Sequence, residues 1–217
     1  MNLRNLKINF LGDSITEGHG VTDVSGRFTN LLADNYGVIA RNYGIGGTRI
    51  AIQKTPSACP RHDLYFIGRV AEMDPDCDVV MVFGGTNDYG HGDAPMGSMS
   101  DRTEETFYGA LHVLYNTLLN RYPESKIIIM TPIHRLDAQQ TKYENGASVN
   151  RSLKQYVDAI REVAEYYSLP VLDLYASYGI QPQVQIMREK FVPDGLHPND
   201  AGHHILAEKI AAFLQTL

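Results

Sequence analysis

Ser14 lies in a short, glycine-flanked turn directly after an apolar stretch near the start of the chain. Residues 9–18 read NFLGDSITEG, so the apolar pattern gives way to Gly12, Asp13 and Ser14 within three positions. A serine hydroxyl becomes a good nucleophile only beside a base that a third group orients. Without these partners, Ser14 would simply cap the next helix.

A candidate base and orienting group follow near the other end of the chain. Asp194 and His197 are three residues apart in the stretch PDGLHPND, just before the last amphipathic segment. This spacing can bring a carboxylate to one imidazole nitrogen and leave the other nitrogen for a serine. An isolated D-x-x-H is more often a turn with a surface histidine, because motifs this short have many false positives.

Two glycine-rich stretches provide candidate hydrogen-bond donors. NYGIGGTR, residues 42–49, comes at the end of the second apolar run. FGGTNDYG, residues 83–90, begins at the last residue of the third run. Acyl transfer needs donors fixed around a developing oxyanion. Gly47 offers a backbone N–H, with the Gly46 N–H as the alternative, and Asn87 offers a side-chain amide. Tight turns and a helix cap explain each alone, but four such elements at one sheet edge indicate a common site.

The blocks GDSIT, GIGGT, GGTND and DGLH resemble the four signature blocks of the SGNH (GDSL-type) hydrolase superfamily, in family order and over nearly the whole chain. Ile15 stands where the family's name has leucine. The resemblance implies that Ser14 is the nucleophile and first oxyanion donor, that Gly47 and Asn87 complete the oxyanion hole, and that His197 is the base. Asp194 would complete a catalytic triad.

The resemblance also implies an activity. It implies a serine esterase that forms an acyl-enzyme, needs no cofactor, and acts on short-acyl esters, such as acetyl esters, of carbohydrates or other small molecules. The enzymatic alternative is a lysophospholipase or thioesterase-type acylhydrolase. A catalytically inactive carbohydrate-binding protein on the same fold is a further alternative, which the intact set of catalytic residues disfavours.

The elements that must position these residues alternate between short apolar runs and long amphipathic stretches. This alternation predicts one α/β domain over residues 1–217, a three-layer αβα sandwich with a doubly wound, mostly parallel five-stranded sheet of the flavodoxin-like kind. Amphipathic helices are expected over residues 103–122 and 149–167 and at the C-terminal end. The expected strands are Lys7–Leu11, Val38–Tyr43, Val79–Phe83, Lys126–Met130 and Val171–Leu174.

Long irregular segments are predicted at residues 54–62, 88–102, 133–146 and 191–199, toward the sheet edge where ligands bind in open α/β folds. We expect the segment 88–102 to act as a partial lid, with Tyr89, His91, Met96 and Met99 as contact surface. Tyr89, His91 and Arg135 are the candidate substrate-binding residues. Asp13 and Asp88 are expected to brace their turns by local hydrogen bonds.

The composition narrows the classes of partner. A formal net charge of −6 and a pI near 5.7 argue against nucleic acid, so a small-molecule ester is the expected partner. Cys59 and Cys77 are interpreted as reduced thiols. No metal site is predicted, because His203 and His204 are adjacent on a helix and face different directions. His19, His62, His91 and His134 are interpreted as loop histidines near the site, more often solvated than in contact with substrate.

The sequence lacks the marks of a targeting or membrane segment. MNLRNLKINF has no apolar core of a signal peptide, so the cytoplasm is expected, or secretion if a leader has been removed. No apolar run approaches membrane-spanning length.

Overall fold

A five-stranded parallel sheet forms the centre of the computed structural model, which describes residues 1–137, 139–144 and 146–217. The strand order is β2-β1-β3-β4-β7, and each neighbouring pair is parallel. This order is the flavodoxin-like one and confirms the predicted doubly wound α/β fold. The strands are β1 Lys7–Gly12, β2 Ile39–Gly44, β3 Val79–Phe83, β4 Lys126–Met130 and β7 Val171–Leu172.

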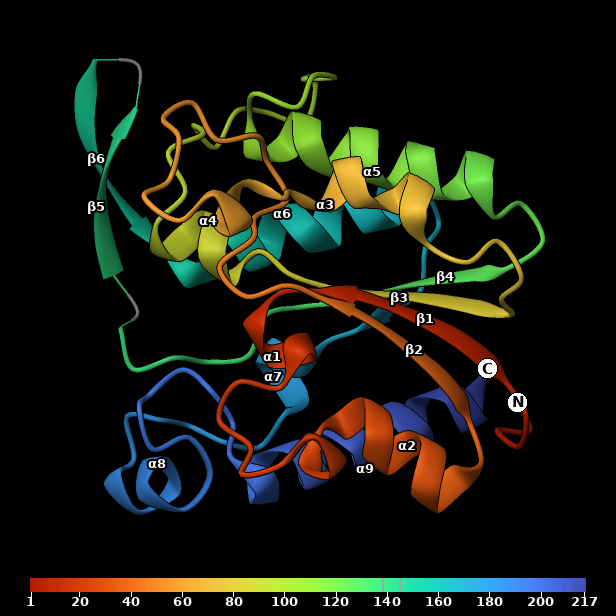
Figure 1. Ribbon diagram of the computed structural model, residues 1–217. Helices are drawn as coiled ribbons and strands as arrows, with labels where there is room; N and C mark the ends of the chain where they lie inside the picture. The colour runs from red at the N-terminus through yellow and green to blue at the C-terminus, as the bar shows by residue number, and fades with distance from the viewer. Residues whose placement is uncertain (138, 145) are drawn as a thin grey trace.

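Helices cover both faces of the sheet and complete three layers (Figure 1). One layer contains α3 Phe66–Arg69, α4 Thr86–Gly90, α5 Phe107–Arg121 and α6 Leu153–Tyr166. The other contains α1 Ser14–Glu17, α2 Phe28–Tyr36, α7 Leu174–Ser177, α8 Gln185–Phe191 and α9 Asp200–Thr216. Short 3₁₀ helices lie at Val24–Gly26, Pro60–Asp63 and Val70–Glu72.

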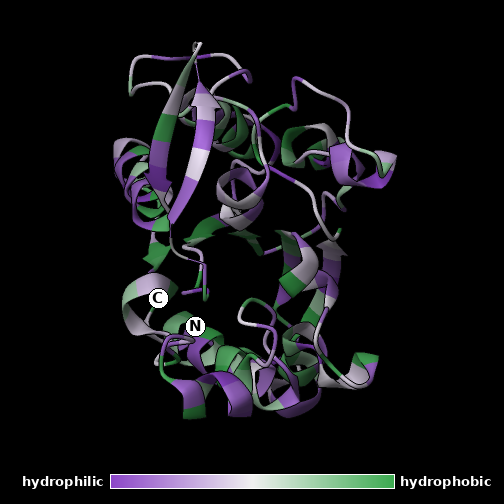
Figure 2. Cartoon of the chain, turned by 90° about the vertical axis from the view of Figure 1, so that its left-hand side faces the viewer, coloured by the Kyte–Doolittle hydropathy of each residue, from purple (hydrophilic) through white to green (hydrophobic). Residues whose placement is uncertain are grey.

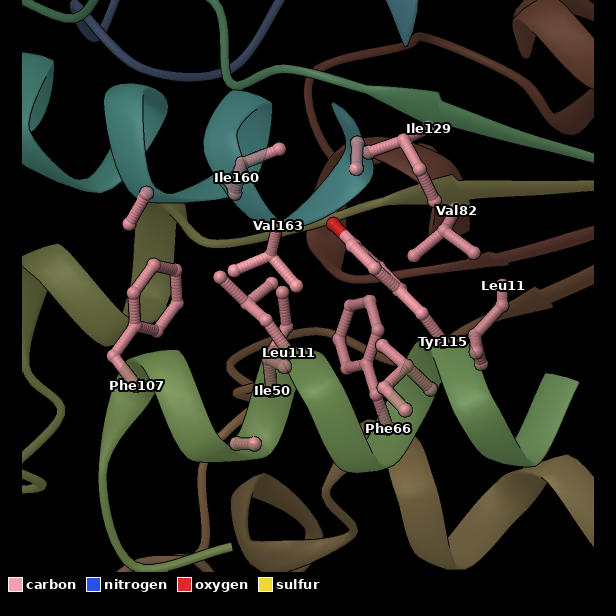
Figure 3. Close-up of a cluster of buried hydrophobic side chains, with 14 of the residues drawn as sticks. Leu11, Ile50, Phe66, Val82, Phe107, Leu111, Tyr115, Ile129, Ile160 and Val163 are labelled. Atoms are coloured by element: carbon pink, nitrogen blue, oxygen red, sulfur yellow. The ribbon is translucent and has the colours of Figure 1, made fainter. Parts of the chain in front are cut away.

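Successive side chains of the strands point to opposite faces of the sheet and pack into two hydrophobic clusters, one on each face. In β3, Val80 and Val82 join the cluster under α5 and α6, whereas Val79 and Met81 join the cluster under α2 and α9. Figure 3 shows the first cluster, in which the ring of Tyr115 from α5 lies against the sheet. The continuous apolar runs in the sequence follow from this burial on both faces. In Figure 2 the hydrophobic strands accordingly lie between the two helical layers.

A two-stranded antiparallel hairpin, β5 Gln139–Glu144 and β6 Ala147–Ser152, corrects the prediction for this part of the chain. The predicted loop 133–146 contains β5, and its residues 138 and 145 lie outside the described part. The helix predicted from residue 149 begins at Leu153 instead. The reason is a capping box, in which Ser152 accepts from the helix backbone and the Gln155 side chain accepts from the Ser152 N–H.

The guanidinium of Arg69 links the carboxyl ends of the strands. It donates to the carbonyl of Gly12 at the end of β1, to the carbonyl of Tyr43 in β2, and to the Thr48 hydroxyl, at 3.2, 2.5 and 3.0 Å. Arg69 is 6% exposed, and its charge lies over the Phe66 ring. Burial lowers the pKa of Arg69 to about 10, so the side chain stays charged at neutral pH. It therefore fixes three segments that converge on one edge of the sheet.

Within the described ranges, no helix combines the length and the apolar character needed to cross a lipid bilayer.

The backbone of α1 packs directly on Gly44 at the end of β2. A Cβ atom added at Gly44 would lie 2.2 Å from the Glu17 nitrogen and 2.6 Å from the Thr16 carbonyl carbon. Both are backbone atoms, so the helix as a whole would have to move.

We expect Gly44→Ala to lower the free energy of unfolding by about 3 kcal/mol, because overpacking against backbone cannot be relieved by a rotamer change. Urea unfolding measures the loss. Gly68→Ala is the control, since its Cβ would lie 3.2 Å from the edge of the Tyr65 ring on an exposed helix position. Equal stability of the two variants would contradict this account of α1.

A second prediction concerns His203 of α9, which is fully buried and accepts a hydrogen bond from the Phe28 N–H at 3.2 Å. Burial lowers the pKa of His203 from 6.5 to about 4. Between these two pH values His203 is protonated in the unfolded chain but neutral in the folded protein. The free energy of unfolding therefore decreases as the pH falls. The contribution is at most about 3 kcal/mol. Burial raises the pKa of Asp13 to about 7, so Asp13 takes up its proton at higher pH in the folded protein than in the unfolded chain. Its contribution to the free energy of unfolding therefore increases as the pH falls.

We therefore expect His203→Gln, which keeps an acceptor, to lose less stability than the parent between pH 6.5 and pH 4 in urea unfolding. His204→Gln, at a neighbouring position where the side chain is 54% exposed, serves as the control. Parallel pH profiles for the parent and His203→Gln would show that His203 does not titrate in this way.

Candidate active site

A chain of hydrogen bonds joins Ser14, His197 and Asp194. The Ser14 Oγ lies 3.0 Å from the His197 Nε2, and the His197 Nδ1 lies 2.6 Å from the Asp194 Oδ2. An ionised carboxylate only accepts, so the imidazole proton is on Nδ1 and the Nε2 lone pair faces the serine hydroxyl. The structure thus brings together three residues that the sequence analysis grouped from opposite ends of the chain.

The turn before α9 holds Asp194 and His197 in this relation. The Asp194 Oδ1 accepts from the backbone N–H groups of Leu196 and His197 at 2.8 and 2.7 Å. Partial burial acts to raise the pKa of Asp194, but these bonds and the His197 ring outweigh it, so the pKa lies below its usual value. The carboxylate is therefore charged and oriented. Asn199 then caps α9 by accepting from the Gly202 N–H at 3.1 Å.

Ser14 begins α1, and one residue, Asp13, separates it from the end of β1. Asp13 caps this short helix by accepting from the Ile15 N–H at 3.1 Å, as the sequence analysis predicted. The Ser14 residue is 4% exposed, at the base of a pocket. Among the described residues its backbone N–H has no acceptor, as is usual in the first turn of a helix.

Gly46 and Gly47 differ in what their N–H groups do. The Gly46 N–H donates to the Glu17 Oε2 at 2.6 Å, and Glu17 is in turn held by Arg61. The Gly47 N–H has no acceptor in the described part of the chain. Gly47 has a φ of +76°, and a Cβ there would lie 2.4 Å from the His62 ring, so only glycine fits. Gly47 is thus the free donor of the two.

Asn87 lies in the first turn of α4, directly after β3. One N–H of its amide donates to the Thr48 carbonyl at 3.0 Å, which fixes the side chain and leaves the other N–H for a ligand. Asp88 was predicted to brace its own turn, and this prediction needs correction. Its carboxylate instead accepts from the distant Ile50 and Ala51 N–H groups at 2.9 to 3.1 Å and ties the Gly47 segment to α4. Burial raises the pKa of Asp88.

A pocket of about 270 Å³ opens over the serine. Its walls include the candidate donors Gly47 and Asn87, and three further histidines besides His197. These are His91, which was a candidate substrate-binding residue, and His19 and His62, which were interpreted only as loop histidines near the site. The fourth loop histidine, His134, packs against the Tyr175 ring at a centroid distance of 4.0 Å and does not line this pocket.

The expected contacts from the segment 88–102 need correction. Tyr89 is fully buried, with its hydroxyl donating to the Asp137 carbonyl at 3.0 Å, and Met96 is 6% exposed. Met99 packs against the hydrophobic core. The segment begins as α4 and then packs against α5. Its large apolar side chains are more stable in the hydrophobic core than exposed over the pocket. Of the four side chains expected to contact a substrate, His91 alone lines the pocket.

Arg135 was also expected to contact substrate, but the structure places its side chain against α4. Its guanidinium donates to the Thr86 carbonyl at 3.2 Å and lies 5.3 Å from the centre of the Tyr89 ring. It does not line the pocket over Ser14. Arg135 therefore contacts α4 through Thr86 and the Tyr89 ring.

Sequence reasoning missed the side chains that hold the site together from behind. Glu17 and Arg49 directly follow recognised blocks, whereas Arg69 lies far from all four, and nothing in the three residue types marks them as buried or paired. The signal available was position, since Glu17 is three residues after Ser14 and Arg49 directly follows GIGGT. In the described ranges, no group of three or more His, Cys, Asp or Glu side chains is arranged to hold a metal ion.

Comparison with solved structures gives matches over the whole chain. One solved chain is 34% identical, with coverage of 100% of this chain and 99% of that chain and a TM-score of 0.85. A protein from Lactobacillus plantarum is 29% identical, with 98% coverage of each chain and a TM-score of 0.81. A two-domain esterase active on acetylated mannans is 22% identical, with a TM-score of 0.63, and the match covers 98% of this chain and 49% of that chain.

No curated protein sequence matches the chain. The family comparison does give a match, and it spans all four sequence blocks that meet at the sheet edge. Residues 10–205 match the model of the GDSL-like lipase/acylhydrolase family, and the chain therefore belongs to this family of the SGNH hydrolase superfamily.

Proposed function

We propose that the protein is a serine esterase that cleaves short-acyl esters through an acyl-enzyme. The observation that carries this proposal is the continuous hydrogen-bond chain from Asp194 through His197 to Ser14, at 2.6 and 3.0 Å, at the base of an open pocket. Nucleophile, base and orienting group are thus each within reach of the next. The same arrangement speaks against an inactive binding module.

In the proposed reaction, the Ser14 Oγ attacks the ester carbonyl carbon while the His197 Nε2 takes the hydroxyl proton. The tetrahedral intermediate collapses, the bond to the alcohol oxygen breaks, and His197 gives its proton to the leaving alcohol. Water then attacks the acyl-enzyme with His197 again as base, which releases the acid and restores Ser14. Asp194 keeps the ring in the required tautomer and stabilises its positive charge in both steps.

Three N–H groups are proposed to stabilise the oxyanion. They are the backbone N–H of Ser14, the backbone N–H of Gly47 and the free N–H of the Asn87 amide, because each lines the pocket and none has an acceptor for that proton among the described residues. The Gly46 N–H is excluded from this role, since Glu17 occupies it. Fixed donors of this kind need no reorganisation when charge develops.

The preference for short acyl groups is proposed from the walls of the pocket. Histidines, an arginine and glycines dominate its lining, and Leu196 is its aliphatic residue. A long alkyl chain needs a deep apolar channel, whereas an acetyl group and a polar alcohol do not. Acetyl esters of carbohydrates fit these walls, and the structurally similar esterase active on acetylated mannans provides a first substrate class to assay. Lysophospholipase or thioesterase activity is the alternative outcome of that assay.

Ser14→Ala is expected to abolish both ester hydrolysis and labelling by a fluorophosphonate, because Ser14 is the hydroxyl that the structure, over the residues it describes, places beside the His197 Nε2. His197→Ala should be nearly as severe, with both variants keeping the parent's unfolding transition. Hydrolysis of p-nitrophenyl acetate measures activity, and Ser25→Ala at an exposed position controls for the substitution. Substantial turnover by purified Ser14→Ala would overturn the mechanism.

Asn87→Ala should lower kcat by roughly a hundredfold or more with a much smaller change in KM, as loss of an oxyanion donor does in other hydrolases. Steady-state kinetics on the same ester measure the two parameters. Asn120→Ala, an exposed asparagine of α5, is the matched control. If kcat is unchanged in Asn87→Ala, the amide only braces the loop through Thr48.

A further inference from the structure

A second histidine of the pocket, His91, lies beside the candidate oxyanion donor Asn87. It directly follows α4, and its backbone N–H donates to the Asn87 carbonyl at 2.9 Å. Residues four apart along a helical turn share one face. Both side chains line the pocket over Ser14. Any substrate whose carbonyl oxygen reaches Asn87 therefore passes the His91 ring.

The position of the imidazole proton on His91 is fixed by Arg49. The Arg49 Nη1 lies 3.0 Å from the His91 Nδ1. A guanidinium can only donate, so this Nδ1 must accept and carries no proton. A neutral imidazole then has its proton on Nε2. Arg49 is itself held rigidly, since it is 2% exposed and its Nη2 donates to Ser57 and Asp63.

His91 stays neutral at physiological pH. Loss of hydration around the ring, followed by the positive charge of Arg49, lowers the pKa of His91 to about 4. The residue as a whole is exposed and lines the pocket over Ser14. In the described part of the chain, its Nε2–H has no acceptor. The pocket thus presents a neutral, fixed donor.

His91 and His197 consequently have opposite tautomers in one pocket. Asp194 places the proton of His197 on Nδ1, so its Nε2 accepts from Ser14. Arg49 leaves the proton of His91 on Nε2, so the same ring atom donates. Only the first arrangement serves a base. The second is suited to hydrogen bonding with a substrate oxygen.

The histidine pairs indicate which part of an ester meets His91. The leaving alcohol must lie near the His197 Nε2, which protonates it, and His19 is the neighbour of His197 at a ring distance of 5.4 Å. His62 and His91 form a separate pair at 6.2 Å, beside Gly47 and the helix of Asn87. This pair flanks the oxyanion donors, on the side available to the acyl group.

A second pocket also borders His91 and offers space for a polar acyl substituent. This pocket has a volume of about 250 Å³ and lies between the segment 91–94 and strand β5. Asp93, Lys142 and Glu144 are among its walls. The Lys142 ammonium donates to the Asp88 and Gly92 carbonyls at 3.0 and 2.8 Å, so it fixes this wall.

We infer that His91 is a specificity-determining residue whose Nε2–H donates to an oxygen on the acyl part of the ester. The favoured substrate class is an ester of a small acid that carries a hydroxyl, ether or carbonyl oxygen near its carboxyl carbon. This inference rests on the proposed esterase function, but it adds a residue and a substrate preference that the triad alone does not supply.

The test compares p-nitrophenyl esters that differ by one CH₂ replaced by oxygen, namely butyrate with methoxyacetate and pentanoate with 3-methoxypropionate. Each kcat/KM is divided by the rate of alkaline hydrolysis, which removes differences in intrinsic reactivity. For at least one pair, the parent should favour the ether by roughly 3- to 10-fold, the range of one hydrogen bond. His91→Phe should lose this preference, and His91→Gln, which restores an N–H at a similar reach, should keep much of it.

The outcomes separate the inference from the function it rests on. A parent that hydrolyses none of these esters contradicts the proposed function. An active parent without an ether preference, or one whose preference survives in His91→Phe, overturns the inference alone. Equal loss of kcat on every ester in His91→Phe also overturns it and would assign the residue to the oxyanion hole.

Nitrogen-15 NMR of the imidazole rings tests the tautomer without any substrate. The His91 signals are assigned by their absence in His91→Gln. They should show a proton on Nε2, a bare Nδ1, and a ring that remains neutral at pH 5.5, because the pKa is about 4. A proton on Nδ1, or a charged ring at that pH, would overturn the inference even if the kinetics agreed.

Discussion

The buried guanidinium of Arg69 is the interaction on which the arrangement of the site depends. A parallel sheet brings its carboxyl ends to one edge, and the buried carbonyl groups of the segments that leave this edge need hydrogen-bond donors. Arg69 donates to Gly12, Tyr43 and Thr48, and so joins the segment before Ser14 to the segment that carries Gly47. Asp88 makes the matching link from α4 to the Gly47 segment. The segments that carry the proposed donors for a substrate oxygen are therefore held by two buried side chains, Arg69 and Asp88.

The sheet and the grouping of Ser14, Asp194 and His197 were predictable because their signals are local. Runs such as VVMVF and KIIIM are buried on both faces, and the structure has strands over the same residues. The hairpin β5–β6 was missed because its two strands pair only with each other, and the less exposed face of β5 consists of the polar residues Gln140, Lys142 and Glu144. Tyr89 shows the opposite failure, since a loop tyrosine next to a glycine gives no sign that its ring will be fully buried.

The choice between Gly46 and Gly47 shows why the rest needed coordinates. Both are glycines in one turn, and their N–H groups are equivalent in the sequence. Glu17, from a different segment, removes one of them from use. The same holds for the protons of His91 and His197, because their positions depend on Arg49 and Asp194 rather than on the histidines. Side-chain chemistry at this edge is set by partners that only the fold brings into contact.

The separation of 183 residues between Ser14 and His197 has a consequence for how the protein folds. Contacts between such distant positions close a large loop, and their entropic cost must be met before they stabilise the chain. The helix α9 has to dock against α2 before the imidazole can approach the serine. Catalytic competence should therefore be among the last properties to emerge during refolding. Recovery of activity would then report completed assembly, whereas far-ultraviolet circular dichroism would recover earlier.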